Sequence, residues 1–184
     1  RQYECVTDEV TLEKWLRKIE AAELTAVDTE TTSLDALAAE LVGISLSVKP
    51  GEACYIPVAH RNGETQLSRD QVLSRMKSWL ESKTHLKVGQ NLKYDIHVFA
   101  NYGITLGGVA FDTLLESYVL ESHLPHNMDS MAERHLGVKT IRYEEVCGKG
   151  AHQIGFDQVD LQVATDYAAE DADITLRLHQ ELWP

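Results

Sequence analysis

The sequence predicts an α/β domain in which helices cover a mixed β-sheet. Strand-like runs gather early in the chain, one more lies between helical segments, and the rest is mainly helical. This order differs from a plain repeat of strand, helix and parallel strand, so it favours a mixed sheet. At 184 residues the chain is long enough for one domain, since a chain of this size buries roughly 70% of the surface that its unfolded form exposes.

The expected strands are short apolar or alternating runs bounded by turn residues. Pro50 and Gly51 lie between two of these runs and predict a hairpin turn. In chain order the expected strands cover residues 2–6, 24–30, 41–48, 53–58 and 86–89.

The expected helices begin at cap residues and carry apolar residues at helical spacing. Thr7 can cap a helix that reaches about residue 22, and Ser68 can cap one that ends near residue 82. Asn91 opens a third helix, which Gly103 stops. Further helices are expected over residues 111–121, 129–136 and about 158–182.

The composition, 43% hydrophobic and 25% charged, is typical of a globular protein, and no apolar run approaches the roughly 20 residues of a membrane span. No signal peptide is visible. The three cysteines are widely spaced, which argues against a disulfide framework or a thiolate zinc site and favours a reducing, cytoplasmic compartment. Because the chain begins at Arg1, we expect residues 1–184 to be one domain of a longer polypeptide.

The net charge of −12 argues at first against a nucleic-acid partner, because binding a polyanion normally requires Lys and Arg. A nuclease can instead hold phosphate through bound cations, and such a site needs carboxylates of its own. The acidic composition is therefore compatible with a substrate bridged by metal ions.

Asp28 and Glu30 form the first candidate site. They stand two residues apart on an expected strand, so their side chains point the same way and lie close together. Two neighbouring like charges are destabilising unless a positive charge lies between them, and a hard divalent cation suits oxygen ligands. The alternative is that both are solvated residues in a loop after the strand.

The last expected helix carries a second candidate. At about 100° per residue, Tyr167 and Asp171 fall inside its apolar stripe, whereas Asp166, Glu170 and Asp173 fall outside it. An unpaired ionised Asp on a core-facing stripe costs several kcal/mol, so it needs a cation, a salt bridge or an open site. A structural Asp paired with Arg or Lys remains the alternative. The stripe comprises Leu161, Ala164, Ala168, Ile174, Leu178 and Leu182.

A third candidate is the turn from an expected strand into a helix at residues 89–95. Asn91 is placed at or near the N-cap, and Asp95 lies about one turn into the helix, where the helix dipole favours negative charge. Taken alone, this pattern is simply a good helix start. Sequence spacing cannot bring Asp95 to the other carboxylates, because only the fold can do so.

Three segments stand in order along the chain: VDTETTSLD at residues 27–35, VGQNLKYD at 88–95 and YAAEDAD at 167–173. They resemble the exonuclease motifs of the DEDD superfamily, in its tyrosine subclass. Over almost the whole chain, the sequence is similar to the proofreading domain of bacterial DNA polymerase I. Three motifs at these separations, with the intervening text also matching, make the resemblance highly specific.

This resemblance implies a ribonuclease H-like fold, with a mixed five-stranded sheet flanked by helices. It also implies two divalent metal ions, Mg²⁺ or Mn²⁺, with Zn²⁺ as an option at one site. Asp28, Glu30 and Asp171 would bind one ion, and Asp28 would bridge to the second, which Asp95 would hold largely through water. Tyr167 and Glu30 would orient the attacking water.

The resemblance further implies a single-stranded DNA 3′ end as substrate and a polymerase domain in the same parent chain. Leu34 and Phe156 would pack on the terminal bases, while Gln90, Asn91 and Tyr94 would line the path of the strand. Ordinary packing in the core is the alternative for Leu34 and Phe156. One departure stands at residues 123–127, a loop that usually carries a basic residue. A backbone contact made there would be weaker or would pass to His126.

The expected activity is removal of nucleoside 5′-monophosphates from a DNA 3′ end by two-metal-ion catalysis, as proofreading for the attached polymerase in the bacterial cytoplasm. The histidines lack the spacing of zinc sites, which argues against a histidine-bound zinc ion. The loop around Lys149 lacks the Walker pattern, which argues against hydrolysis of nucleoside triphosphates. Two alternatives remain: an exoribonuclease resembling ribonuclease D, and a catalytically silent domain that only holds a single strand.

Overall fold

The computed structural model describes residues 1–183 and contains one mixed β-sheet. Its spatial strand order is β1-β4-β3-β2-β5-β6, and β3 runs antiparallel to both of its neighbours, whereas the other pairs are parallel. The expected α/β class with a mixed sheet is confirmed. The strands are β1 (Gln2–Cys5), β2 (Leu24–Thr31), β3 (Leu41–Lys49), β4 (Glu52–Pro57), β5 (Leu86–Gly89) and β6 (Val109–Asp112).

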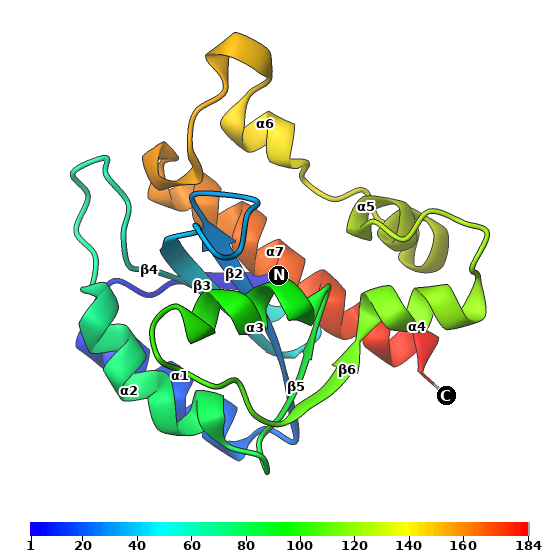
Figure 1. Cartoon of the computed structure of the whole chain (residues 1–184), viewed down its shortest axis with the longest axis horizontal. Helices are drawn as coiled ribbons and strands as arrows, with labels where there is room; N and C mark the ends of the chain where they lie inside the picture. The colour runs from blue at the N-terminus through cyan, green and yellow to red at the C-terminus, as the bar shows by residue number, and fades with distance from the viewer. Residues whose placement is uncertain (184) are drawn as a thin grey trace.

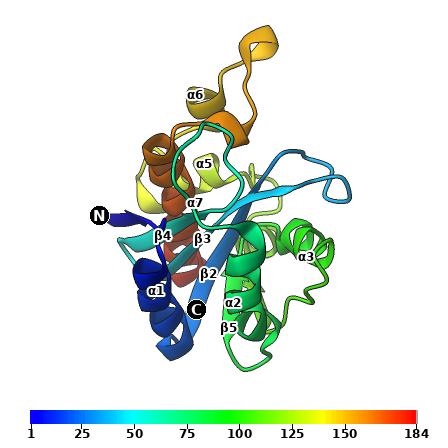
Figure 2. The ribbon, with the colours of Figure 1, turned by 90° about the vertical axis from the view of Figure 1, so that its left-hand side faces the viewer.

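Helices cover both faces of this sheet. The long helix α7 crosses one face, and α1, α2 and α3 lie on the other side (Figures 1 and 2). The α-helices are α1 (Glu9–Ala21), α2 (Arg69–Glu81), α3 (Leu92–Ala100), α4 (Thr113–Leu120), α5 (Met128–Met131), α6 (Tyr143–Cys147) and α7 (Leu161–Leu182). A π-helical turn η1 (Ala132–Leu136) continues α5, and two 3₁₀ turns, η2 (Gly150–His152) and η3 (Phe156–Gln158), precede α7.

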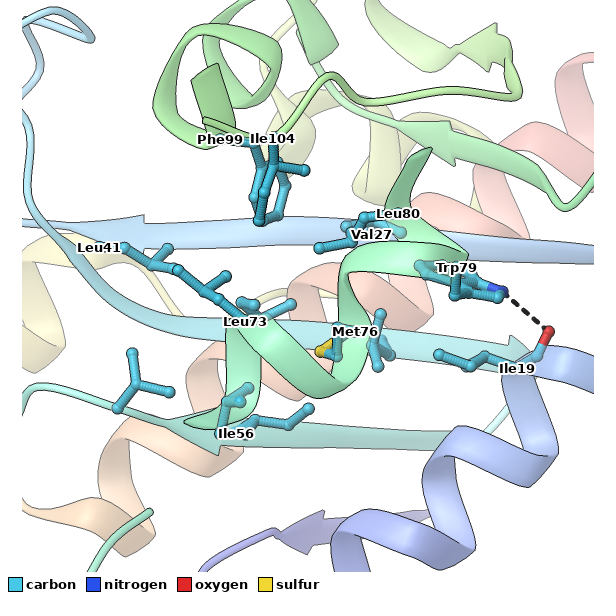
Figure 3. Packing of buried hydrophobic residues seen from close by; sticks show 14 of the residues in the cluster. Ile19, Val27, Leu41, Ile56, Leu73, Met76, Trp79, Leu80, Phe99 and Ile104 are labelled. Carbon is cyan, nitrogen blue, oxygen red and sulfur yellow. Dashed lines mark hydrogen bonds between the residues drawn. The ribbon is translucent and has the colours of Figure 1, made fainter. Parts of the chain in front are cut away.

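The main core lies between the sheet and helices α1 to α3. Val27 and Leu41 from the strands meet Met76 of α2 and Phe99 of α3 there, and the indole N–H of Trp79 donates to the carbonyl of Ile19 over 3.1 Å (Figure 3). Because side chains alternate along a strand, odd-numbered residues of β2 face this core. The even-numbered residues of β2 therefore face α7.

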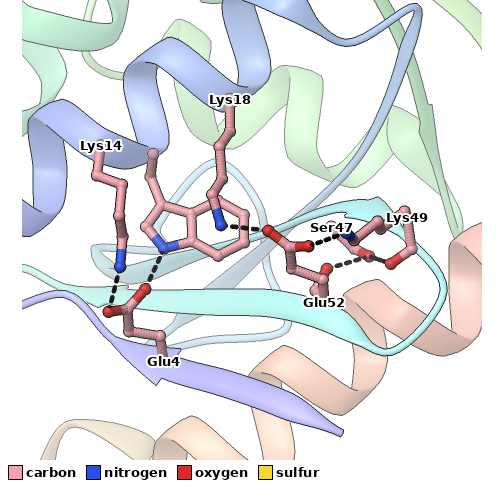
Figure 4. Close-up of polar contacts among 7 residues, drawn as sticks. Glu4, Lys14, Lys18, Ser47, Lys49 and Glu52 are labelled. Atoms are coloured by element: carbon pink, nitrogen blue, oxygen red, sulfur yellow. Dashed lines mark hydrogen bonds and ion pairs between the residues drawn. The ribbon is translucent and has the colours of Figure 1, made fainter.

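A polar network joins α1 to the edge of the sheet. Glu4 on β1 accepts hydrogen bonds from Lys14 and from the indole of Trp15, and Glu52 on β4 pairs with Lys18 and Lys49 (Figure 4). This network orients α1 across β1 and β4, next to the start of the chain.

Two expected helix starts differ from the structure. Asp8, rather than Thr7, caps α1 and accepts from the backbone N–H of Thr11 over 2.8 Å, because a carboxylate one residue later reaches the free amide. Phe111 belongs to β6 rather than to the following helix, and α4 begins only at Thr113. Strand β6 makes the sheet six-stranded instead of five-stranded, because residues 109–112 pair with β5.

Helix α7 is buried on more than its apolar stripe. Glu170 and Asp173 are each only 1% exposed, although the helical spacing placed them outside the core-facing side. Glu170 pairs with Arg1 and accepts from the N–H of Ile141 over 2.6 Å. Asp173 accepts from the Tyr3 hydroxyl over 2.6 Å and from another backbone amide. Segments distant in sequence cover the sides of the helix and bury these two carboxylates. The hydrogen bonds and the ion pair compensate for the cost of that burial.

Within residues 1–183, every helix is too short or too polar to cross a membrane.

Candidate active site

The end of β2 carries two carboxylates toward α7. Ala26, on the same face of the strand, packs against Leu176 of α7, and Asp28 and Glu30 follow it with the period of two that a strand imposes. Gly43 of β3 pairs with Glu30 in the sheet register, which places the acidic residues inside the sheet rather than in a loop. The alternative of two solvated loop residues does not apply.

Asp171 approaches this pair from α7. One carboxylate oxygen from each of Asp28, Glu30 and Asp171 lies within 4.8 Å of the others. Helix α7 packs on β2, β3 and β4, so the acidic cluster lies where helix and sheet meet. Residues far apart in sequence therefore form one group of oxygen ligands, which is the donor type that hard divalent cations prefer.

No cationic side chain neutralises this cluster. Within residues 1–183, the ion pairs include none of its members. Burial raises the pKa of Asp28 to about 7, and burial followed by repulsion from Asp28 raises the pKa values of Glu30 and Asp171 well above their usual range. The cluster is thus electrostatically incomplete and fits a group that brings positive charge.

Asp95 lies beside the cluster rather than in it. Its carboxylate accepts from both the backbone N–H and the hydroxyl of Thr29, over 3.1 Å and 2.5 Å. Thr29 faces the side of β2 opposite to its two acidic neighbours, so Asp95 reaches the strand from α3. Burial and then repulsion from Asp28 raise the pKa of Asp95. The negative charge of Asp28 therefore acts on Asp95 across the strand.

The N-terminus of α3 is held in place by a residue of a neighbouring strand. Asn91 stands at the N-cap as expected, with φ of 59°, but its side chain caps no amide of the helix. The carboxylate of Asp112 on β6 accepts from the N–H groups of Asn91 and Leu92 instead, over 3.0 Å and 2.8 Å. The unexpected sixth strand therefore anchors the start of the helix that carries Asp95.

Tyr167 stands one helical turn before Asp171. Burial, followed by the negative charge of Asp171, raises the pKa of its hydroxyl, which therefore keeps its proton at neutral pH. Its ring packs at 5.8 Å from the ring of Phe156 and at 6.2 Å from that of Tyr143. The hydroxyl is thus a fixed hydrogen-bonding group rather than a base.

The acidic cluster opens into a cavity of about 640 Å³. Its walls come from the end of β2 with the following loop, from Gln90 and α3, from Met128, from α6 with the segment after it, and from α7. The Tyr94 hydroxyl donates to the carbonyl of Ser33 over 2.5 Å, which ties α3 to the loop that carries Leu34. A cavity of this size, with three carboxylates in its wall, can admit a nucleotide-sized ligand.

Residues 3–184 match the sequence model of a family described as 3′-5′ exonuclease. The chain belongs to the 3′-5′ exonuclease family. It is 55% identical to DNA polymerase I of Pseudomonas aeruginosa, over 98% of this chain and 20% of that protein. It is 43% identical to DNA polymerase I of Rhizobium leguminosarum, over 99% of this chain and 20% of that protein. The chain therefore spans about a fifth of the length of these curated relatives.

Solved structures share the fold of this exonuclease. Escherichia coli RNase D, described as an exoribonuclease involved in structured RNA processing, superposes with a TM-score of 0.67 at 19% identity, over 99% of this chain and 44% of that one. A structure titled as the POL domain of Pol1 from M. smegmatis, in complex with DNA primer-template and dNTP, gives a TM-score of 0.69 at 20% identity. That match covers 97% of this chain and 27% of that one. The expected ribonuclease H-like fold is confirmed.

The residues expected to contact substrate do not all lie at the cavity of this exonuclease. Leu34 is 98% exposed and lines it, as do Gln90 and Tyr94. Asn91 is exposed next to the cavity but is not part of its wall. Phe156 is 1% exposed and packs among Tyr55, His60 and Tyr167, so in this structure it has no free face for a base. Burial under Tyr167 thus argues against the expected contact between Phe156 and terminal bases.

Tyr143 is an aromatic residue of the cavity wall that the sequence did not single out. It begins α6, is 42% exposed and faces Tyr167. The sequence shows a weak signal for this short helix, since Glu144 and Glu145 follow as acidic residues of a first turn. His126 does not line the cavity, although its carbonyl accepts from the amide of Gln90 over 2.9 Å.

Proposed function

We propose that this exonuclease hydrolyses the 3′ end of single-stranded DNA and releases nucleoside 5′-monophosphates, with two divalent ions, Mg²⁺ or Mn²⁺. The observation that carries the proposal is the convergence of Asp28, Glu30 and Asp171 in one cavity without a neutralising side chain. Such a group of carboxylates is a costly arrangement unless cations complete it.

The donor set supports hard divalent cations. Asp28, Glu30 and Asp171 would hold one ion, and Asp28 would share the second with Asp95. The hydrogen bond from Thr29 fixes the Asp95 carboxylate beside β2. When bound, such ions supply an activated water near neutral pH and stabilise the negative charge that develops on the phosphate and the leaving 3′ oxygen.

The side chains around the cluster would position substrate and water. The protonated hydroxyl of Tyr167 and the carboxylate of Glu30 would orient the attacking water by hydrogen bonds. Leu34 and Tyr143 would pack on the terminal bases, because both present apolar surface to the cavity and stacking tolerates any base. Gln90 and Tyr94 would line the path of the strand.

DNA is the proposed substrate, and proofreading for a polymerase domain of the same parent chain is the proposed role. The curated relatives named DNA polymerase I support both, since the present chain spans only about a fifth of their length. We take residues 1–184 as a single exonuclease domain of such a protein. The likeness to RNase D rests on identities below a quarter and supports the fold alone.

The test is a hydrolysis assay on matched DNA and RNA oligonucleotides with a labelled 5′ end. Single-nucleotide shortening of DNA with Mg²⁺, release of 5′-monophosphates and no shortening after chelation would support the proposal. Faster shortening of RNA would favour an exoribonuclease instead. A protein that takes up no Mn²⁺ by calorimetry and shortens neither strand would be a silent scaffold. Asp171→Asn, which preserves side-chain volume, serves as the inactive control.

A further inference from the structure

A second groove adjoins the active-site cavity at Tyr143. It has a volume of about 540 Å³ and lies between α5 and the loop that follows α6, and it shares Tyr143 and Gln153 with the cavity. Figure 1 shows α6 with its loop above α7, and α5 beside it. Arg142 and Lys149 line the groove, which we call the Arg142 groove.

The side chain of Arg142 is the free cation of this groove. It is exposed, and within residues 1–183 it takes part in none of the ion pairs. Its backbone N–H donates to Glu145 over 2.6 Å, which fixes the main chain at the start of α6 but leaves the guanidinium free. The guanidinium of Arg142 therefore offers an exposed positive charge beside the acidic cavity, where it can bind an anionic partner.

The acidic side chains of the groove are already engaged. Glu144 pairs with Lys149 at 2.9 Å, and Asp129 accepts from the hydroxyl of Thr140 over 2.5 Å. An anion entering the groove would therefore meet the free guanidinium of Arg142 and the ammonium of Lys149, which Glu144 already pairs. The bond from Thr140 leaves the negative charge of Asp129 in place.

Neutral hydrogen-bonding groups complete the wall. The Asn127 side-chain oxygen accepts from the N–H of Ser130 over 2.9 Å, which leaves its amide N–H groups for other partners. Arg142 also borders a third cavity of about 320 Å³, which Lys139 lines together with the carboxylates of Asp129, Glu133, Glu144 and Glu145.

We propose that the Arg142 groove binds the sugar–phosphate backbone of the strand, upstream of the nucleotides held in the cavity. The inference rests on the proposed function, since it takes the 3′ end to lie at the acidic cluster. Tyr143 stands at the boundary, where its ring separates the bases in the cavity from the phosphates in the groove. Arg142 contributes a bidentate contact to phosphate, and Lys149 a second charge.

The test is the binding of a labelled oligothymidylate dinucleotide and decanucleotide, followed by fluorescence anisotropy. Ca²⁺ replaces Mg²⁺ in this assay, because its looser coordination supports binding without efficient hydrolysis. For Arg142→Ala, the ratio of the decanucleotide affinity to the dinucleotide affinity should fall about fivefold at roughly 0.1 M salt. The slope of log affinity against log salt concentration for the decanucleotide should become shallower by about 0.7, as expected for one lost phosphate contact. Glu144→Gln should raise that advantage, because it frees Lys149.

The matched control is Lys83→Ala, which removes one exposed positive charge after α2, away from the groove. An unchanged length advantage in Arg142→Ala, or an equal fall in Lys83→Ala, would overturn the inference. A Mg²⁺-dependent hydrolysis assay on the same decanucleotide is run in parallel. If the wild-type protein binds with the expected length dependence but shortens no strand, the proposed function fails while the groove stands.

Discussion

Thr29 and Asp95, which are 66 residues apart in sequence, are joined by two hydrogen bonds to one carboxylate oxygen. Thr29 stands between Asp28 and Glu30 on β2 but faces the opposite side of the strand. The strand thus holds three acidic residues at once, two through its own side chains and the third through the residue between them. The position of α3 relative to the acidic cluster depends on this contact.

Thr29→Val tests this arrangement, because Val keeps the shape of Thr and removes only the hydroxyl. The buried carboxylate of Asp95 would lose its shorter hydrogen bond, so the free energy of unfolding should fall by about 1–2 kcal/mol. Affinity for Mn²⁺ should fall about tenfold or more, as expected for a group that orients a ligand. Urea unfolding and calorimetry measure the two effects. Thr25→Val, at another buried position of β2, is the control, and unchanged Mn²⁺ affinity in Thr29→Val would count against the role of the hydroxyl.

Asp28→Ala should abolish hydrolysis and leave the metal-free fold intact. Asp28 raises the pKa values of Glu30, Asp95 and Asp171 by repulsion, so its removal relieves repulsion in the absence of cations. The melting temperature measured with chelator should stay level or rise, whereas the stabilisation that Mn²⁺ gives the wild-type protein should disappear. A large fall in the metal-free melting temperature would show that Asp28 has a structural role instead.

Stability of the metal-free protein should decrease as the pH rises. Burial raises the pKa of Asp28 to about 7, so the folded protein binds this proton more tightly than the unfolded chain does. The resulting stabilisation is complete below about pH 4, the usual pKa of Asp, and is lost as the pH rises through about 7. Glu30, Asp95 and Asp171 shift in the same direction. Melting curves with chelator at pH 5.5 and pH 8 check this sign, and saturating Mg²⁺ should remove the difference.

Tyr167→Phe should slow hydrolysis by on the order of 100-fold at most, less than loss of a carboxylate ligand, because it removes an orienting group. The ring contacts with Phe156 and Tyr143 remain, so the fold should be preserved. Single-turnover rates and Mn²⁺ titration separate the two effects. Loss of Mn²⁺ binding in this variant would contradict the role proposed for the hydroxyl.

The periodicity of apolar residues along the sequence was enough to predict much of the fold and of the candidate site. The period of two on β2 predicted that Asp28 and Glu30 share a face, and the helical stripe predicted that Asp171 points toward the sheet. The position of Asp95 had no local signal, since it depends on Thr29 and on the cap that Asp112 provides. Neither the pairing of residues 109–112 with β5 nor the cover of Glu170 by Arg1 could be predicted from spacing, because both involve distant segments.

Tyr143 and Phe156 provide the sharpest comparison between a substrate contact and a core residue. Phe156 is 1% exposed, so Phe156→Ala should lower the free energy of unfolding by about 3–5 kcal/mol, as for other large buried aromatics. Tyr143 is 42% exposed at the cavity wall, so Tyr143→Ala should cost far less stability and should raise the KM for single-stranded DNA. A lost stacking contact corresponds to about 1–3 kcal/mol, or roughly 5- to 150-fold in KM. Urea unfolding and steady-state kinetics on both variants decide between the two roles. If Phe156→Ala instead kept its stability and raised KM, the base contact would belong to Phe156 after all.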